Sequence, residues 1–218
     1  MPVSRLQIVI VAAASMALAF VLAAYIYSAQ REDAIRAVSE AEDSPLEREY
    51  SVSEGPADAR VVLVEFFDPA CETCREFHPY VKKLLAAHPG KVRLVLRYAP
   101  LHQGSDTMVL ILEAARRQGR FWETLEVMYA TQPQWASHHQ PRPELIWQFL
   151  PDAGVDVERI RKDMRDPDMM AVMHQDLADG RVLGVRRTPQ FFVNGKPLLS
   201  FGRRQLKSLL DSEVAARY

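Results

Sequence analysis

The sequence predicts an α/β fold in which a block of helices separates a strand–helix–strand unit from a β-hairpin. The runs 60–67 and 92–98 are rich in β-branched and aromatic residues, as expected for strands buried within a sheet. Residues 71–88 between them have apolar side chains at helical spacing, so the three elements predict a right-handed βαβ unit. A further apolar strand at 190–193 is followed by Asn194-Gly195, a dipeptide typical of hairpin turns.

The N-terminal segment predicts a membrane helix. Residues 6–27 form a stretch without any charged side chain. A helix of that length rises roughly 33 Å, enough to cross a bilayer core of about 30 Å. The alternative is a cleaved signal peptide, whose apolar region is usually about 7–15 residues long. Residues 17–19 could serve as its cleavage site. Because the apolar stretch continues beyond that site, we expect an uncleaved signal-anchor over 1–28.

The charges that flank this helix predict its orientation. Arg5 precedes the apolar stretch and mixed charges follow it, so the positive-inside rule places the N-terminus in the cytoplasm. Residues 29–57 are charged and poor in large apolar side chains, and we expect a charged stalk that links the membrane to the body. Both the anchored and the cleaved alternative export the body. We expect it at the inner membrane, facing the periplasm, where disulfides persist.

Helical spacing of apolar residues continues through 103–183 without a strand pattern. We therefore expect this block to be a helical insertion in a domain formed by 58–102 and 184–218. The domain ends in a helix over 205–216. The formal net charge is −1 and no basic stripe is visible, so the sequence offers no support for nucleic-acid binding.

The two cysteines of the chain, Cys71 and Cys74, form a C-x-x-C that follows the first strand and opens the helix. A sulfur at a helix N-terminus is stabilised as a thiolate, so we expect the pKa of Cys71 to lie below the free value of about 8.5. The second sulfur lies one turn along the same helix face, close enough to close a small disulfide ring. Cys71 is the candidate nucleophile and Cys74 the candidate resolving thiol.

Two other interpretations of the cysteine pair are an inert structural bridge and a metal site. Zinc would need two further ligands. The adjacent His138 and His139 lie in a proline-rich loop and not at ligand-like spacing, so we expect no metal.

Three motifs together resemble the DsbA-like family of thiol-disulfide oxidoreductases. They are Glu65-Phe66-Phe67 leading into the C-x-x-C, Phe77-His78-Pro79, and the run Thr188-Pro189-Gln190-Phe191-Phe192-Val193-Asn194-Gly195. The resemblance covers about 55–218. It implies a thioredoxin-like fold with an inserted helical domain, behind the N-terminal transmembrane helix. It also implies an enzyme that exchanges disulfides with exported proteins without a cofactor, because the dithiol is the redox group, and that uses a membrane redox partner.

The resemblance assigns roles to three more residues. Pro189 is expected to be cis and to pack beside the C-x-x-C, which leaves the backbone of Thr188 free to pair with an extended substrate. Glu65 is expected to lie beneath the active-site disulfide and to take the proton of the buried thiol. The alternatives are an ordinary trans proline opening an edge strand, and a Glu65 that faces outward at a strand end.

The direction of electron flow stays open at the level of sequence. Glu72 beside Cys71 opposes thiolate formation if it points toward the sulfur, which predicts a couple less oxidising than that of DsbA at about −120 mV. A tethered reductase, for example in cytochrome c maturation, is the enzymatic alternative. A non-catalytic metallochaperone or holdase module is the alternative from another class. The substrates and the oligomeric state are likewise not determined.

Overall fold

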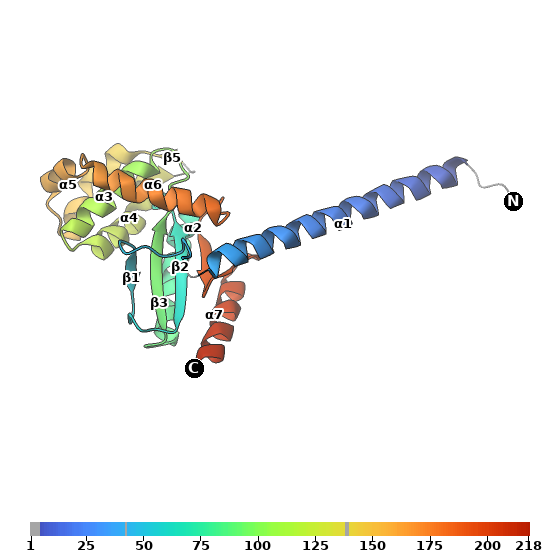
Figure 1. The fold of residues 1–218 in the computed structure, drawn as a ribbon. Coiled ribbons are helices and arrows are strands. Elements are labelled where there is room, and N and C mark those ends of the chain that lie inside the picture. Colours follow the sequence, from blue (N-terminus) through green and yellow to red (C-terminus); the bar gives the residue numbers. More distant parts are fainter. Residues whose placement is uncertain (1–4, 42, 138–139) are drawn as a thin grey trace.

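A five-stranded mixed sheet forms the centre of the body, with strand order β1-β3-β2-β6-β7 (Figure 1). The central pair, β2 (Val61–Phe67) and β3 (Val92–Tyr98), is parallel. The outer strands β1 (Val52–Glu54), β6 (Gln190–Val193) and β7 (Lys196–Pro197) each run antiparallel to their inner neighbours. The computed structural model describes residues 5–41, 43–137 and 140–218. The predicted strands and the hairpin are therefore confirmed within one or two residues.

Helices cover both faces of this sheet. On one face, α2 (Glu72–Ala87) and α7 (Arg203–Arg217) pack on the apolar side chains of β2 and share one core with them. Against the other face lie the C-terminal end of α6 (Pro167–Val182), where Gly180 contacts the ring of Phe66, and the last turns of α1. Because strand residues alternate between faces, Leu63, Glu65 and Phe67 of β2 point toward α2.

The helical block lies between β3 and β6, as expected. Its members are α3 (Ser105–Arg117), α4 (Phe121–Trp135), the two-residue strands β4 (Ala136–Ser137) and β5 (Gln140–Pro141), two short 3-10 helices at Pro143–Gln148 and Leu150–Ala153, α5 (Val157–Asp163) and α6. His138 and His139 lie outside the described residues. The buried side of α3 and α4 joins the core that contains α2 and α7, so the block packs as a layer on the α/β unit.

The N-terminal helix, α1, is longer than the apolar stretch and runs from Arg5 to Ser39. Among the described residues, α1 is the helix that is long and apolar enough to cross a membrane. The candidate span is Ile10–Ser39, and the mean hydropathy of its most apolar window is 2.2. Figure 1 shows it projecting from the body. Its C-terminal end contacts the body, where the Ser39 hydroxyl donates to the carbonyl of Gly195 at 2.5 Å.

Part of the expected stalk differs from the prediction, because it folds onto the body. Strand β1 pairs with β3, and Leu46 is 6% exposed in a cluster with Val64 and Phe66. A three-residue strand and an isolated leucine leave no periodic pattern, which is why the charged composition of 29–57 pointed to a linker.

Buried ion pairs hold this segment in place. Arg97 of β3 is fully buried, and its guanidinium lies 2.8 Å from Asp176 and 2.6 Å from Asp179, both on α6. Tyr50 donates to Asp176 at 2.7 Å, and Arg48 binds Asp179 at 2.7 Å. Charges of this kind are tolerated inside a protein only when they are paired, so the network ties the segment before β1 to α6 and β3.

Candidate active site: an asymmetric pair of cysteines

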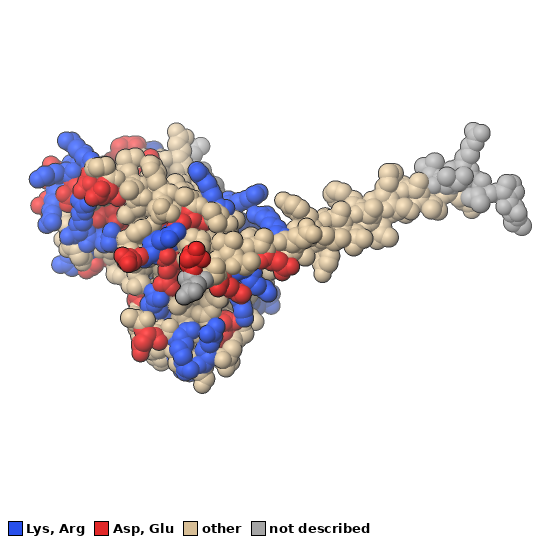
Figure 2. Space-filling view, viewed as in Figure 1, with Lys and Arg blue, Asp and Glu red and all other residues tan. Residues whose placement is uncertain are grey.

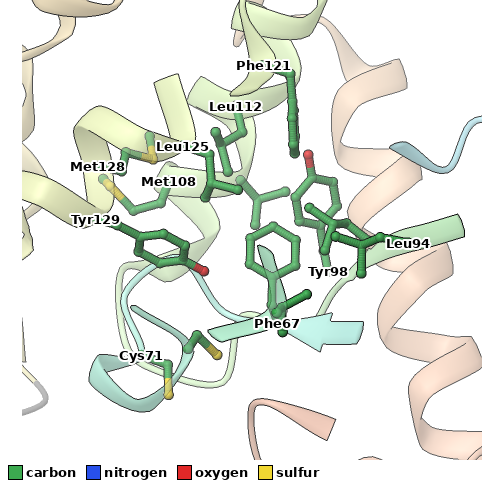
Figure 3. Close-up of a cluster of buried hydrophobic side chains, with 14 of the residues drawn as sticks. Phe67, Cys71, Leu94, Tyr98, Met108, Leu112, Phe121, Leu125, Met128 and Tyr129 are labelled. Carbon is green, nitrogen blue, oxygen red and sulfur yellow. The ribbon is translucent and has the colours of Figure 1, made fainter. Parts of the chain in front are cut away.

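The two cysteines lie where β2 ends and α2 begins. Cys71 is the residue that caps α2, and Cys74 lies one turn into the helix. Both are free thiols in this structure, and their exposed fractions are 4% for Cys71 and zero for Cys74. Figure 3 shows Cys71 at the margin of the apolar cluster that surrounds Phe67. Only the first sulfur therefore has a route to a partner outside the protein.

The environment gives the two thiols opposite acidities. The hydrogen bond from Cys74 is the largest cause that lowers the pKa of Cys71, to about 5, with help from Thr188 and from the backbone N–H groups at the start of α2. Burial is the largest cause that raises the pKa of Cys74 well above 9.0. At neutral pH the arrangement holds a thiolate on Cys71 and a proton on Cys74. Such a thiolate is the reactive species in disulfide exchange.

Glu65 lies on the β2 face that points toward α2. It is 3% exposed, so the outward-facing alternative is not what the structure shows. Burial and the neighbouring Cys71 raise the pKa of Glu65 to about 8. Its charge also contributes to the raised pKa of Cys74. A carboxyl group with this pKa can exchange a proton near neutral pH.

The loop before β6 brings Thr188 and Pro189 to the cysteines. The peptide bond between these two residues is cis, and Pro189 is buried. Sγ of Cys71 lies 3.4 Å from the backbone carbonyl oxygen of Thr188. The structure thus brings all five residues singled out from the sequence, Glu65, Cys71, Cys74, Thr188 and Pro189, into one site.

Sequence reasoning missed Asp68, which organises the loop before Cys71. Its buried carboxylate accepts hydrogen bonds from the backbone N–H of Ala70 at 2.8 Å and of Leu101 at 2.8 Å. It also accepts from the backbone and the ring Nδ1 of His102, at 3.0 and 2.7 Å. The Asp68 hydrogen bond raises the pKa of His102. An aspartate three residues before a helix-opening cysteine is the signal that could have identified this residue.

The helical block supplies two further residues that the sequence did not single out. Gln132 of α4 is fully buried, and its side-chain amide donates to the backbone carbonyls of Pro69 at 2.9 Å and Cys71 at 3.2 Å. Tyr129, one turn earlier, is buried on the same side of the cluster as Cys71 (Figure 3). The sequence signal that could have identified Gln132 is a glutamine on the apolar face of an expected core helix.

A thiolate at a helix start, a buried second thiol and an adjoining cis-proline loop on this fold define a thiol-disulfide oxidoreductase of the DsbA type. The thioredoxin family model matches residues 47–212, and the chain belongs to that family. A thioredoxin-like oxidoreductase from Silicibacter pomeroyi is 29% identical, with a TM-score of 0.67 over 79% of this chain and 97% of that one. The resemblance stated from the motifs is therefore confirmed.

Two more distant structures share the fold. BdbD from Bacillus subtilis, in its oxidised form, has 21% identity and a TM-score of 0.67 over 76% of this chain and 93% of that one. A linker-deletion variant of ScsC from Proteus mirabilis has 17% identity and a TM-score of 0.71 over 99% of both chains.

Curated relatives of known name are much longer proteins. The Na(+)/H(+) antiporter NhaA of Herminiimonas arsenicoxydans is 31% identical over 171 residues, which are 78% of this chain and 27% of the antiporter. The antiporter NhaA 3 of Salinispora tropica is 31% identical over 185 residues, 82% of this chain and 27% of the relative. The chain thus spans about a quarter of the length of the curated relatives that it matches.

Proposed function

We propose that this chain is a membrane-anchored oxidoreductase of the periplasm that exchanges disulfides with exported proteins through Cys71 and Cys74. The observation that carries the proposal is the asymmetry of the two thiols. The pKa of Cys71 is lowered to about 5, whereas Cys74 is fully buried and its pKa is raised well above 9.0. One sulfur is thereby suited to react with a partner and the other to resolve the product.

In the oxidising direction, a substrate thiolate attacks Sγ of Cys71 in the disulfide form of the pair. The S–S bond breaks, and its electron pair leaves on Cys74. A second substrate thiolate then attacks the substrate sulfur that is bound to Cys71, and Cys71 leaves as a thiolate. The substrate gains a disulfide and the pair is left reduced. In the reducing direction, the same steps run backwards, with Cys71 as the nucleophile.

Glu65 supplies the proton that this cycle needs. Cys74 leaves as a thiolate in a site where burial strongly favours its neutral form. The carboxyl of Glu65, with a pKa of about 8, is mostly protonated at neutral pH and can give its proton to Cys74. When the disulfide forms again, the carboxylate takes the proton back.

The loop at Thr188 and Pro189 receives the substrate. The carbonyl of Thr188 already lies against Sγ of Cys71, so a chain that pairs with this backbone brings its own cysteine to the reacting sulfur. The helical block over 103–183 contacts the start of α2, where the side-chain amide of Gln132 donates to the carbonyl of Cys71. We propose the block as an insertion in a domain made of 58–102 and 184–218.

The acidity of Cys71 supports a redox potential between those of the two best-known members of the superfamily. The thiol pKa is about 3.5 in DsbA and about 7 in thioredoxin, with potentials of about −120 and −270 mV. A stabilised thiolate favours the reduced pair and makes the couple more oxidising. The value of about 5 for Cys71 supports an intermediate couple, less oxidising than DsbA, and the partner potential decides which way electrons flow.

Membrane attachment is supported by α1, whose apolar window has a mean hydropathy of 2.2 and no buried residue. The alignment of this chain with part of much longer membrane antiporters also supports a place at a membrane. The positive-inside rule puts the body on the periplasmic side. There it meets exported proteins with cysteine thiols or disulfides, and a membrane redox partner restores the pair.

The test is a redox titration of the full-length protein in detergent micelles against glutathione buffers, with oxidation of the pair followed by alkylation shift. We expect a single two-electron transition between about −120 and −270 mV. Cys71→Ser and Cys74→Ser are the matched variants. The first is expected to abolish exchange with a model substrate, and the second to accumulate a mixed disulfide that only added thiol releases.

Different results would support the other classes of protein. A metal carrier would bind stoichiometric metal that either cysteine substitution abolishes. A holdase would keep its function after loss of both cysteines. The absence of any reversible transition contradicts the oxidoreductase proposal.

A further inference from the structure

A cavity of about 420 Å³ lies where α1 meets the body. One wall is formed by α1 from Tyr27 to Ile35, and the other by the segments around Leu183–Arg187 and Pro197–Leu199. The two walls are in close contact. A Cβ built on Gly184 would lie 2.9 Å from Cδ1 of Ile35 and 3.5 Å from Nη2 of Arg31. The cavity is distinct from the cysteine site.

The charge of this cavity is positive and not neutralised. Three arginines, Arg31, Arg186 and Arg187, and one acidic residue, Glu32, are among the residues that line it. Within the described ranges, no ion pair joins any of these arginines to an acid, although arginines elsewhere on the body are commonly paired. Figure 2 shows basic side chains gathered on the body beside the point where α1 leaves it. Arginines that line one cavity without an ion-pair partner are suited to bind a phosphate.

The position of the cavity along α1 places it at the membrane surface. The apolar stretch of α1 ends at Tyr27, an aromatic residue of the kind enriched at that interface, and Tyr27 lines the cavity. Arg31 follows one helical turn later, about 6 Å further along the axis. The polar headgroup layer outside the hydrocarbon core is about 5–8 Å thick on each side. Arg31 and the cavity therefore lie at the depth of lipid phosphates.

Apolar side chains of the body extend the same surface. The inner part of the cavity includes Leu183, Phe192 and Leu198. At its margin Leu199 is 46% exposed, and the neighbouring Val182 is 60% exposed. A water-soluble anion gains nothing from such a lining, whereas the glycerol and first methylenes of a phospholipid are buried by it.

We propose that this cavity binds the phosphate headgroup of an anionic phospholipid in the leaflet from which α1 emerges. This site rests on the membrane span proposed above but not on the redox chemistry. Arg187 directly precedes Thr188, whose carbonyl contacts Cys71. A lipid held by the arginines therefore keeps the loop of the redox site at the membrane surface, where partners embedded in or tethered to the bilayer can reach it.

The proposal is tested by native mass spectrometry of the full-length protein in detergent, titrated with phosphatidylglycerol or with phosphatidylcholine. We expect one phosphatidylglycerol to bind preferentially. Arg186→Gln with Arg187→Gln should weaken that binding at least about tenfold, given the typical contribution of each arginine to binding of anionic lipid. The matched control is Arg165→Gln with Arg204→Gln, which removes two exposed arginines that lie outside the cavity. It should bind as the unchanged protein does.

Other results overturn the proposal. Equal binding of phosphatidylglycerol and phosphatidylcholine shows that the protein has no specific lipid site. An equal loss of phosphatidylglycerol binding in both double variants shows diffuse electrostatic attraction and no site. Competition by millimolar inorganic phosphate without any preference for lipid shows a free-anion site. Flotation of the protein with liposomes tests the span separately. A protein that does not float overturns both span and site, while one that floats without lipid preference overturns the site alone. Retained disulfide exchange in the Arg186/Arg187 variant shows that the redox function is unaffected.

Discussion

Sγ of Cys71 lies 3.4 Å from the backbone carbonyl oxygen of Thr188, although the two residues are 117 positions apart in the chain. The contact joins the start of α2 to the loop before β6. It is possible because β2 and β6 are neighbours in the sheet, so the end of one strand meets the beginning of the other. This relationship places the reactive sulfur against the backbone that we propose to receive substrate.

The alkylation rate of Cys71 should depend on pH in a way that reports its lowered pKa. Because the thiolate is the reactive species, the rate with iodoacetamide should rise through pH about 5 and level off above about 6. Mass spectrometry of the reduced protein measures it. In Cys74→Ala the hydrogen-bonding thiol is removed, so the midpoint should move to higher pH. A rate in the unchanged protein that climbs steadily to pH 9 contradicts this prediction.

The reduced protein should gain stability over the oxidised protein as pH rises. The folded pKa of Cys71, about 5, lies below the unfolded value of 9.0, so the stabilisation is complete above 9.0 and is lost as pH falls through 5. The disulfide form has no such thiolate. Between pH 5 and 7 the difference in unfolding free energy should grow by about 2–3 kcal/mol. Urea unfolding of both forms in detergent measures it, and parallel pH profiles would count against the thiolate.

Glu65→Gln should stabilise the reduced protein at alkaline pH. The folded pKa of Glu65, about 8, lies above its usual 4.5, so its contribution is complete below 4.5 and is lost as pH rises through 8. At pH 8.5 the variant should exceed the unchanged protein by about 3 kcal/mol in urea unfolding, with a much smaller gain at pH 5. Disulfide exchange should slow about tenfold or more, because the proton of Cys74 loses its donor and acceptor.

The control for this variant is Glu76→Gln, which changes an exposed glutamate on α2. Neither its stability profile nor its exchange rate should change. If Glu65→Gln and Glu76→Gln behave alike in both measurements, Glu65 has no part in proton transfer.

Asp176→Ala should be strongly destabilising. Asp176 is 2% exposed and accepts from Arg97, from Tyr50 and, at 2.7 Å, from the backbone N–H of Tyr98. Its removal leaves the buried charge of Arg97 short of a partner, and we expect a loss of about 3–5 kcal/mol in unfolding free energy. Asp168→Ala, at an exposed position of the same helix, should change stability by less than about 0.5 kcal/mol. Equal effects of the two substitutions contradict the structural role of the network.

Sequence reasoning recovered the elements whose pattern is local. Strand β6 was predicted at the residues where the structure has it, and the helix of the C-x-x-C was placed within one residue. The pair Cys71 and Cys74 was identified because a strand followed by C-x-x-C has few other meanings. Strand β1 was missed because three residues at a sheet edge take their conformation from the pairing with β3 and not from a pattern of their own.

The sequence by itself determined the α/β class, the redox pair and the apolar segment, because each depends on residues that are close along the chain. Only the tertiary structure decided the rest. It buried Glu65, brought the carbonyl of Thr188 to Cys71 and placed Asp68 and Gln132 around the loop. These features depend on burial and on contacts between distant segments, and burial together with hydrogen bonding sets the opposite acidities of the two thiols.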